Sequence, residues 1–211
     1  MNSKKFEIKI NGQKIKLQEG LHLVDPSHGI GIVQSVESQE VFGEEVVLCS
    51  ILFLNENLKL LIPVNKMKDM GIRTLSSKDI VQKIVSNVLS KSAKCNRGVW
   101  TKRIVEYETK FFSGSVVLIA EVVRDLFQST YDSTRSYGER MLFEKAMYRL
   151  CNEFSLVLGV PYEEAYRTVY DALMISAPVI KDETVEELDD VDGGDFDDDD
   201  EDADDDNVAV A

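Results

Sequence analysis

The sequence predicts a two-part fold: a small all-β barrel or sheet, followed by an all-α bundle of about five helices and an acidic tail. Up to about Leu75, apolar and polar residues alternate and β-branched residues are frequent, which is typical of short strands. After Ser76 and Ser77, apolar residues recur at helical spacing instead. Residues 182–206 then contain 17 of the 38 acidic residues and no basic residue.

Turn signals divide the β region into strands. Asn11 and Gly12 separate "FEIKI" from "QKIKL", and both tolerate a positive φ, so residues 6–17 are predicted to form a β-hairpin. The segments "GIGIVQSVESQEV", "EEVVLCSILFL" and "LKLLIPV" follow, separated by Gly43 and by residues 55–57. Short strands joined by short turns predict a small barrel or sheet.

Five helices are predicted after the change of period. The first follows a serine cap and carries Ile80, Ile84 and Val88 on one face. Gly159 is expected to end the fourth helix in a left-handed conformation. The last four helices are predicted over residues 101–112, 115–131, 136–158 and 161–176.

These patterns divide the chain into four segments: a hairpin extension over residues 1–18, a β domain over 19–76, a helical domain over 77–177 and an acidic tail over 178–211. The tail has too few apolar residues to offset the loss of chain entropy on folding, so we predict that it is disordered. Outside residues 182–206, the chain has 24 basic and 21 acidic residues, which gives a net charge of +3 there against −14 overall.

Composition also restricts the class of protein. No run of about 18 apolar residues is present, and "MNSKKFEIKI" lacks the apolar core of a secretory signal. Cys49, Cys95 and Cys151 are far apart and odd in number, which favours reduced thiols over a disulfide framework. We therefore expect a cytoplasmic protein that does not contact a membrane.

The stretch "VDPSHGIGIV", residues 24–33, could be a glycine loop that binds phosphate or a bend in a sheet. A dinucleotide loop needs a third glycine where the chain has Gln34, and a helix directly after it. Here the following residues alternate as a strand. The stretch is therefore interpreted as a sheet turn whose glycines permit tight geometry.

No other pattern marks a catalytic or metal-binding site. His22 and His28 are the only histidines, and no cysteine or histidine has the spacing of a zinc site. No nucleophile, base and acid stand out as a catalytic set. We predict that the protein is not an enzyme and binds no metal or cofactor.

The most distinctive charged segment is "KSAKCNRGVWTKRIV", residues 91–105. It has five basic residues and no acidic one, and it contains the only tryptophan, Trp100. One interpretation is structural: with Thr101 as N-cap, Trp100 and Val105 have the spacing of a hydrophobic staple. The other is nucleic-acid binding, in which cations hold phosphates and the ring wedges at a base step. Both roles can coexist.

Several motifs, in order along the chain, resemble those of the CarD/CdnL family of bacterial transcription regulators. "DPSHGIGIVQSVESQEVFGEE" and "LLIPVNKMKDMGIRTLSS" resemble the family's N-terminal module, which transcription-repair coupling factors share. "NRGVWTKRIVEYETKFFSG" and "IAEVVRDLF" resemble its C-terminal helical module, which the coupling factors lack. The resemblance covers roughly residues 21–176, so the hairpin and the acidic tail lie outside it.

The resemblance implies a Tudor-like β domain that docks on the β subunit of RNA polymerase, sheet edge to sheet edge. Such docking uses unpaired backbone groups for affinity and alternate side chains for specificity. Family members often carry arginines on this face, where this chain has Gln39 and Leu61. Either polymerase binding relies more on apolar contact here, or the surface of the partner has changed in step; a further alternative is that Leu61 faces the core. The candidate polymerase-binding residues are Gln39, Glu40, Val41, Lys59 and Leu61.

The resemblance also implies that the helical domain contacts promoter DNA. Trp100 matches the family's minor-groove wedge, and Arg140 matches a basic position of its DNA-facing surface. The protein would then bind at the upstream edge of the transcription bubble and stabilise the open complex, with little sequence specificity. It would act as a monomer and be associated with the nucleoid through the polymerase. The alternative is an adaptor whose helical domain binds protein and not DNA. The candidate DNA-binding residues are Lys94, Arg97, Trp100, Lys102, Arg103 and Arg140.

The acidic tail leads to a test by truncation. About 30 flexible residues reach roughly 30 Å, far enough for the tail to compete with DNA phosphates for the basic segment. Truncation after Pro178 should then tighten binding to free DNA at about 50 mM salt, and the gain should fade as salt rises. An anisotropy titration of the full-length and truncated proteins measures this difference. Equal affinities at low salt would exclude competition and leave the tail a role in solubility.

Overall fold

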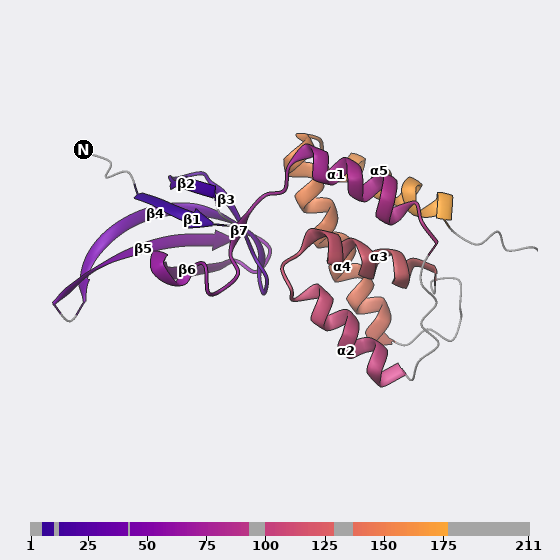
Figure 1. Ribbon diagram of the computed structural model, residues 1–211, viewed down its shortest axis with the longest axis horizontal. Helices are drawn as coiled ribbons and strands as arrows, with labels where there is room; N and C mark the ends of the chain where they lie inside the picture. The colour runs from indigo at the N-terminus through magenta and orange to yellow at the C-terminus, as the bar shows by residue number, and fades with distance from the viewer. Residues whose placement is uncertain (1–5, 11–12, 42, 93–99, 129–136, 177–211) are drawn as a thin grey trace, which may run out of the picture. The chain divides into compact units, whose positions relative to one another are not determined.

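The computed structural model describes residues 6–10, 13–41, 43–92, 100–128 and 137–176. Within these residues, the strands come first and five α-helices follow, as predicted (Figure 1). The acidic tail lies outside the described residues. The strands are β1 (Phe6–Ile10), β2 (Gln13–Leu17), β3 (His22–Asp25), β4 (Gly29–Val41), β5 (Glu44–Phe53), β6 (Leu58–Pro63) and β7 (Arg73–Thr74). The helices are η1 (Val64–Lys66), α1 (Lys78–Ile84), η2 (Val85–Leu89), α2 (Trp100–Phe111), α3 (Val116–Gln128), α4 (Tyr137–Leu158) and α5 (Tyr162–Ser176).

Antiparallel pairing builds two sheets in the β region. β1 and β2 pair along their whole length as the predicted hairpin. The other five strands form one sheet in the order β6-β5-β4-β3-β7, so β6 and β7 are its edges. The glycine stretch forms the turn between β3 and β4, with Asp25 opposite Gly29. This pairing confirms that the stretch is a sheet turn.

One apolar cluster fills the β region, and Gly31 lies against it. A Cβ at Gly31 would be 2.4 Å from Cγ2 of Ile51 and 2.9 Å from Cε1 of Phe53, so a larger residue would displace the core. Phe6 and Ile8 of the hairpin pack against the same cluster. Its buried members are Leu17, Leu23, Val33, Cys49, Ile51, Phe53, Ile62, Met67 and Ile72.

The first helix is capped as predicted but turns a different face to the core. The Oγ of Ser77 accepts a hydrogen bond from the backbone N–H of Ile80. However, the predicted core residue Ile80 is 39% exposed, whereas Val81, Ile84 and Leu89 are buried. Ile80 lies in the first turn of α1, beside the cap, and stays at the surface. Further along, α1 continues into the π-helical turn η2, whose wider spacing accounts for the burial of Leu89.

The helices α1–α5 enclose a second apolar cluster, distinct from that of the β region. The largest fully buried side chains in it include Ile84, Leu126, Leu150, Phe154 and Leu173. Gly159 ends α4 as predicted: its φ is +75°, and its N–H donates to the carbonyl of Ser155 at 2.8 Å.

The β and helical regions meet through a buried ion pair. Glu153 of α4 is 3% exposed, and its carboxylate accepts hydrogen bonds from both terminal nitrogens of Arg73 at 2.7 and 2.8 Å. The same carboxylate accepts from the N–H of Ser76 at 3.0 Å and from its hydroxyl at 2.7 Å. Nε of Arg73 donates to the carbonyl of Gly114, between α2 and α3, at 2.7 Å. A bidentate charge-assisted pair of this kind fixes orientation as well as distance.

Removing Glu153 should therefore destabilise the whole fold. Glu153→Ala leaves the Arg73 side chain, which is only 13% exposed, buried without its countercharge, and the expected loss of unfolding free energy is about 3–5 kcal/mol. Urea unfolding followed by circular dichroism measures the loss. Glu144→Ala, at an exposed position of the same helix, is the control and should change stability by less than about 0.5 kcal/mol. Equal losses in the two variants would contradict the assignment.

Candidate functional site

β6 presents an unpaired sheet edge with alternating side chains. In the part of the chain that the structure describes, it pairs with β5 on one side and with no strand on the other. Lys59 and Leu61 face outward, and Leu61 is 63% exposed, whereas Ile62 is 3% exposed. The alternative that Leu61 faces the core is therefore wrong.

The other predicted polymerase-binding residues lie at the far end of β4. Gln39, Glu40 and Val41 belong to the end of the β4–β5 hairpin. β6 stops at Pro63, which pairs with Leu48, so this end of the hairpin extends beyond β6. Gln39 and Glu40 are exposed. The structure thus brings Lys59 and Leu61 together on one edge and separates them from the other three residues by β5.

The first turns of α2 and α4 lie side by side (Figure 1). Nη2 of Arg103 in α2 is 3.3 Å from Oε1 of Glu139 in α4, and Glu139 is only 5% exposed. Lys102 and Arg140, the neighbours of these two residues in sequence, are exposed. The ion pair compensates part of the charge of Arg103. Lys102 and Arg140 are therefore the exposed cations that the first turns of α2 and α4 present to solvent. Lys94 and Arg97 lie outside the described residues.

The start of α2 differs from the one that the predicted hydrophobic staple requires. The helix begins at Trp100, so Thr101 lies inside its first turn and is not the N-cap. Val105, the expected staple partner, is 60% exposed. The staple geometry is therefore wrong, and the packing of α2 does not depend on it.

The turn between β3 and β4 uses its own backbone donors. Oδ2 of Asp25 accepts hydrogen bonds from the N–H groups of Ser27 and His28, both at 2.9 Å. Nδ1 of His28 lies 2.6 Å from Oε2 of Glu56 in the loop after β5. Since a phosphate loop must offer free N–H groups to its ligand, this turn cannot act as one.

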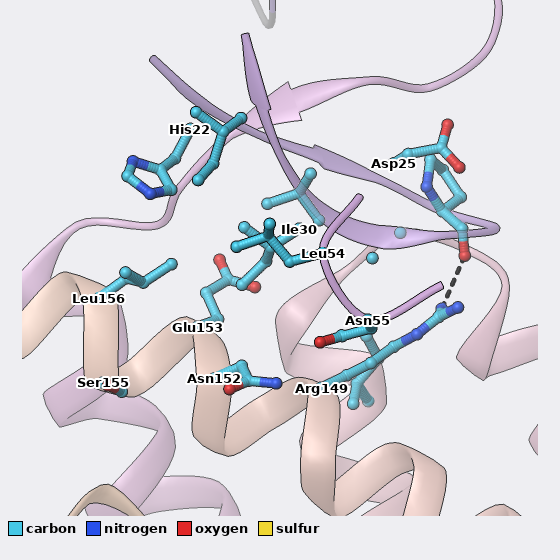
Figure 2. A pocket seen from close by; sticks show the side chains of 16 residues that line it. His22, Asp25, Ile30, Leu54, Asn55, Arg149, Asn152, Glu153, Ser155 and Leu156 are labelled. Atoms are coloured by element: carbon cyan, nitrogen blue, oxygen red, sulfur yellow. Dashed lines mark hydrogen bonds between the residues drawn. The ribbon is translucent and has the colours of Figure 1, made fainter. Parts of the chain in front are cut away.

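A cavity of about 200 Å³ separates the β3–β4 hairpin from α4 (Figure 2). Ile30 and Leu54 lie on one side of it, and Asn152 and Leu156 of α4 lie on the other. Typical small-molecule sites have volumes of roughly 300–1,000 Å³. We therefore assign no ligand to this cavity and treat it as a packing gap between the two regions.

The two described cysteines are buried and poorly reactive. Burial raises the pKa of Cys49 to about 11 and that of Cys151 to about 12, so both thiols stay protonated and poorly nucleophilic at neutral pH. Among the described residues, no group of three His, Cys, Asp or Glu side chains could hold a metal ion. None of the described helices has the length and apolar composition needed to cross a membrane.

Sequence reasoning missed the residues that join the two regions. The motif that contains Arg73 predicts no contact for it, and helical spacing places Arg149 and Glu153 only within the predicted helix over residues 136–158. A signal existed for Glu153: it is an acid among the apolar residues of a helix that buries Leu150 and Phe154. A buried acid requires a partner.

Comparison with known proteins matches both regions of the chain. Residues 17–76 match the CarD-like/TRCF RID domain, and residues 84–170 match the family described as CarD, C-terminal domain. The chain is also similar to the "Putative transcription factor YdeB" of Bacillus subtilis (strain 168), with 26% identity over 144 residues, which are 68% of this chain and 93% of that protein. With the β region and the helical region matched in the same order, the chain belongs to the CarD-like family of transcription regulators.

Proposed function

We propose that this protein binds the β subunit of RNA polymerase through its β domain and promoter DNA through the start of α2, and thereby stabilises the open complex. The observation that carries the proposal is the ion pair between Arg103 and Glu139, 3.3 Å apart. It holds the first turns of α2 and α4 together, so Trp100, Lys102 and Arg140 share one end of the helical region. An aromatic residue among cations suits a minor groove that is being opened.

The DNA contact combines weak charges with one wedge. Lys102 and Arg140 hold phosphates, aided by Lys94, Arg97 and Arg103, and the ring of Trp100 enters a base step at the upstream edge of the bubble. Occupation of that step slows re-annealing of the two strands. Because few phosphates are contacted, the affinity for DNA alone is low and falls steeply with salt.

The polymerase contact uses the edge of β6. Its free backbone groups extend a sheet of the partner, while Leu61 and Lys59 supply apolar and charged contacts on alternate positions. Gln39, Glu40 and Val41 add a second contact at the end of the β4–β5 hairpin. Binding to the polymerase raises the local concentration of the helical region at the promoter, so that one monomer joins two weak contacts into a stronger one.

In this proposal the polymerase-binding domain is residues 19–76 and the DNA-binding domain is residues 77–177. No catalytic step is involved.

A second candidate function is a protein-interaction adaptor. The outer side of α5 favours it: Tyr166 and Tyr170 are each 38% exposed, and their rings stack 6.2 Å apart. Exposed tyrosines are frequent in protein interfaces. In that case the helical domain would bind a protein, and the exposed cations of α2 and α4 would not contact DNA.

Trp100→Ala tests the DNA contact. Loss of the wedge should cost on the order of 1–3 kcal/mol of DNA binding, by analogy with base–aromatic stacking. The variant should bind polymerase normally and shorten the lifetime of the open complex. Anisotropy with forked promoter DNA, with and without polymerase, and a heparin-challenge lifetime measure the two effects.

Tyr166→Ala is the control for the loss of an exposed aromatic side chain elsewhere on the helical region. It should leave DNA affinity and open-complex lifetime unchanged. If Tyr166→Ala abolishes the effect on the open complex while Trp100→Ala does not, the adaptor function is the correct one.

Leu61→Asp tests the polymerase contact. Burial of a leucine side chain in an interface is worth about 1.5–3 kcal/mol, so the dissociation constant for the β subunit should rise about tenfold or more. Surface plasmon resonance with the isolated β subunit measures it. Met70→Asp, at a residue of the β region that is 44% exposed and lies off the β6 edge, should bind normally. Equal weakening by both substitutions would exclude a specific contact at β6.

A further inference from the structure

Arg149, in the middle of α4, contacts two separate parts of the fold. Its Nη1 donates to the carbonyl of Pro26 at 2.7 Å, and its Nη2 donates to the carbonyl of Ser27. The centre of the guanidinium lies 4.1 Å from the centroid of the Phe111 ring, at the end of α2. Figure 2 shows Arg149 and its hydrogen bond to the β3–β4 turn. Since the same guanidinium lies on Phe111, a single side chain of α4 links this turn to the last turn of α2.

These contacts require the shape of an arginine. A planar guanidinium donates in its plane to two successive carbonyls while its face lies on an aromatic ring, which a lysine ammonium cannot do. Nε of Arg149 would lie 3.7 Å from a Cβ on Gly29, so the side chain fits closely against the turn. Burial lowers the pKa of Arg149, whereas the carboxylates of Glu56 and Asp25 raise it. An arginine remains charged in such a site.

The turn that Arg149 holds is also enclosed on its other side. Cγ of Pro26 would lie 3.1 Å from a Cβ on Gly71 and 3.0 Å from a Cβ on Gly114. Both glycines have a φ of +74°, a conformation that other residues rarely adopt. Pro26 therefore fits between the segment before β7 and the turn between α2 and α3. A movement of the β3–β4 turn would consequently displace the turn that follows α2.

α2 is consequently held at both ends. Arg149 holds its last turn at Phe111, and Glu139 holds its first turn through Arg103. The helix has 12 residues and is about 18 Å long at ~1.5 Å per residue. Because the first turn stays tied to α4 through Glu139, loss of the Arg149 contact would free the Phe111 end and change the direction of α2 relative to the β3–β4 turn.

We infer that Arg149 is a positioning residue that fixes the direction of α2, and with it the basic start of the helix, relative to the β3–β4 turn. The inference rests on the proposed function, because it assigns to Arg149 the coupling between the polymerase-binding edge and the DNA-binding helix start. When the β region is bound to polymerase, a fixed geometry makes the DNA contact effectively intramolecular and raises the affinity for DNA. A looser geometry reduces this increase in affinity without changing the polymerase contact or the DNA contact itself.

The first experiment measures geometry and needs neither polymerase nor DNA. Spin labels on Glu37→Cys in β4 and Glu108→Cys in α2, both exposed positions, report the distance between the two regions in the full chain with Cys95→Ser. The distance distribution should be narrow in the parent protein and broad in Arg149→Met. Arg167→Met, which removes an exposed arginine of α5, should leave it narrow. An unchanged distribution in Arg149→Met overturns the inference.

The second experiment measures coupling. Arg149→Met should bind the β subunit alone and forked DNA alone with affinities within about twofold of the parent, but polymerase-assisted DNA binding should weaken about tenfold or more. If assisted binding is unchanged although the distance distribution has broadened, the inference is wrong. If Arg149→Met loses helical content, Arg149→Lys replaces it: it keeps the charge and stem and should still broaden the distribution. Failure of the parent protein to bind polymerase or DNA would refute the proposed function and leave the distance measurement valid.

Discussion

The buried ion pair of Arg73 and Glu153 is the contact on which the arrangement of the two regions depends. An unpaired carboxylate in the interior is strongly unfavourable. α4 can therefore bury Glu153 only because Arg73 of β7 lies beside it. The same pair collects Ser76, at the start of the helical region, and Gly114, between α2 and α3. The two apolar clusters, which are otherwise separate, thereby become parts of one arrangement, and both proposed binding surfaces are mounted on it.

Local patterns predicted most of the fold. The β-hairpin, the glycine turn between β3 and β4, the change of period after Ser76 and the end of α4 at Gly159 are each determined by a few neighbouring residues. The core face of the first helix was not predicted correctly. A period of 3.6 residues selects Ile80, which lies in the first turn of α1 and stays exposed. It does not select Leu89, which is buried at the end of the π-helical turn η2, because nothing in the local pattern announces that insertion.

The candidate site was less predictable because its parts come from distant positions. The types of residue at the start of α2 indicate a basic surface, yet the ion pair of Arg103 with Glu139 joins residues 36 apart, and that of Arg73 with Glu153 joins residues 80 apart. Such pairings follow from tertiary packing and not from spacing. Alternation along β6 predicted two faces, but only the paired sheet distinguishes the outer face, which carries Leu61, from the inner one.

The open edge of β6 also bears on how the protein behaves at high concentration. A strand that can extend the sheet of a partner can equally extend the sheet of a second copy, and an exposed leucine makes that pairing more favourable. Three features of β6 limit this risk: it has six residues, Lys59 places a charge on its outer face, and Pro63 ends it. The edge is therefore a compromise between recognition and solubility: a short strand with one apolar and one charged outward side chain keeps the proposed docking edge accessible but is a poor template for aggregation.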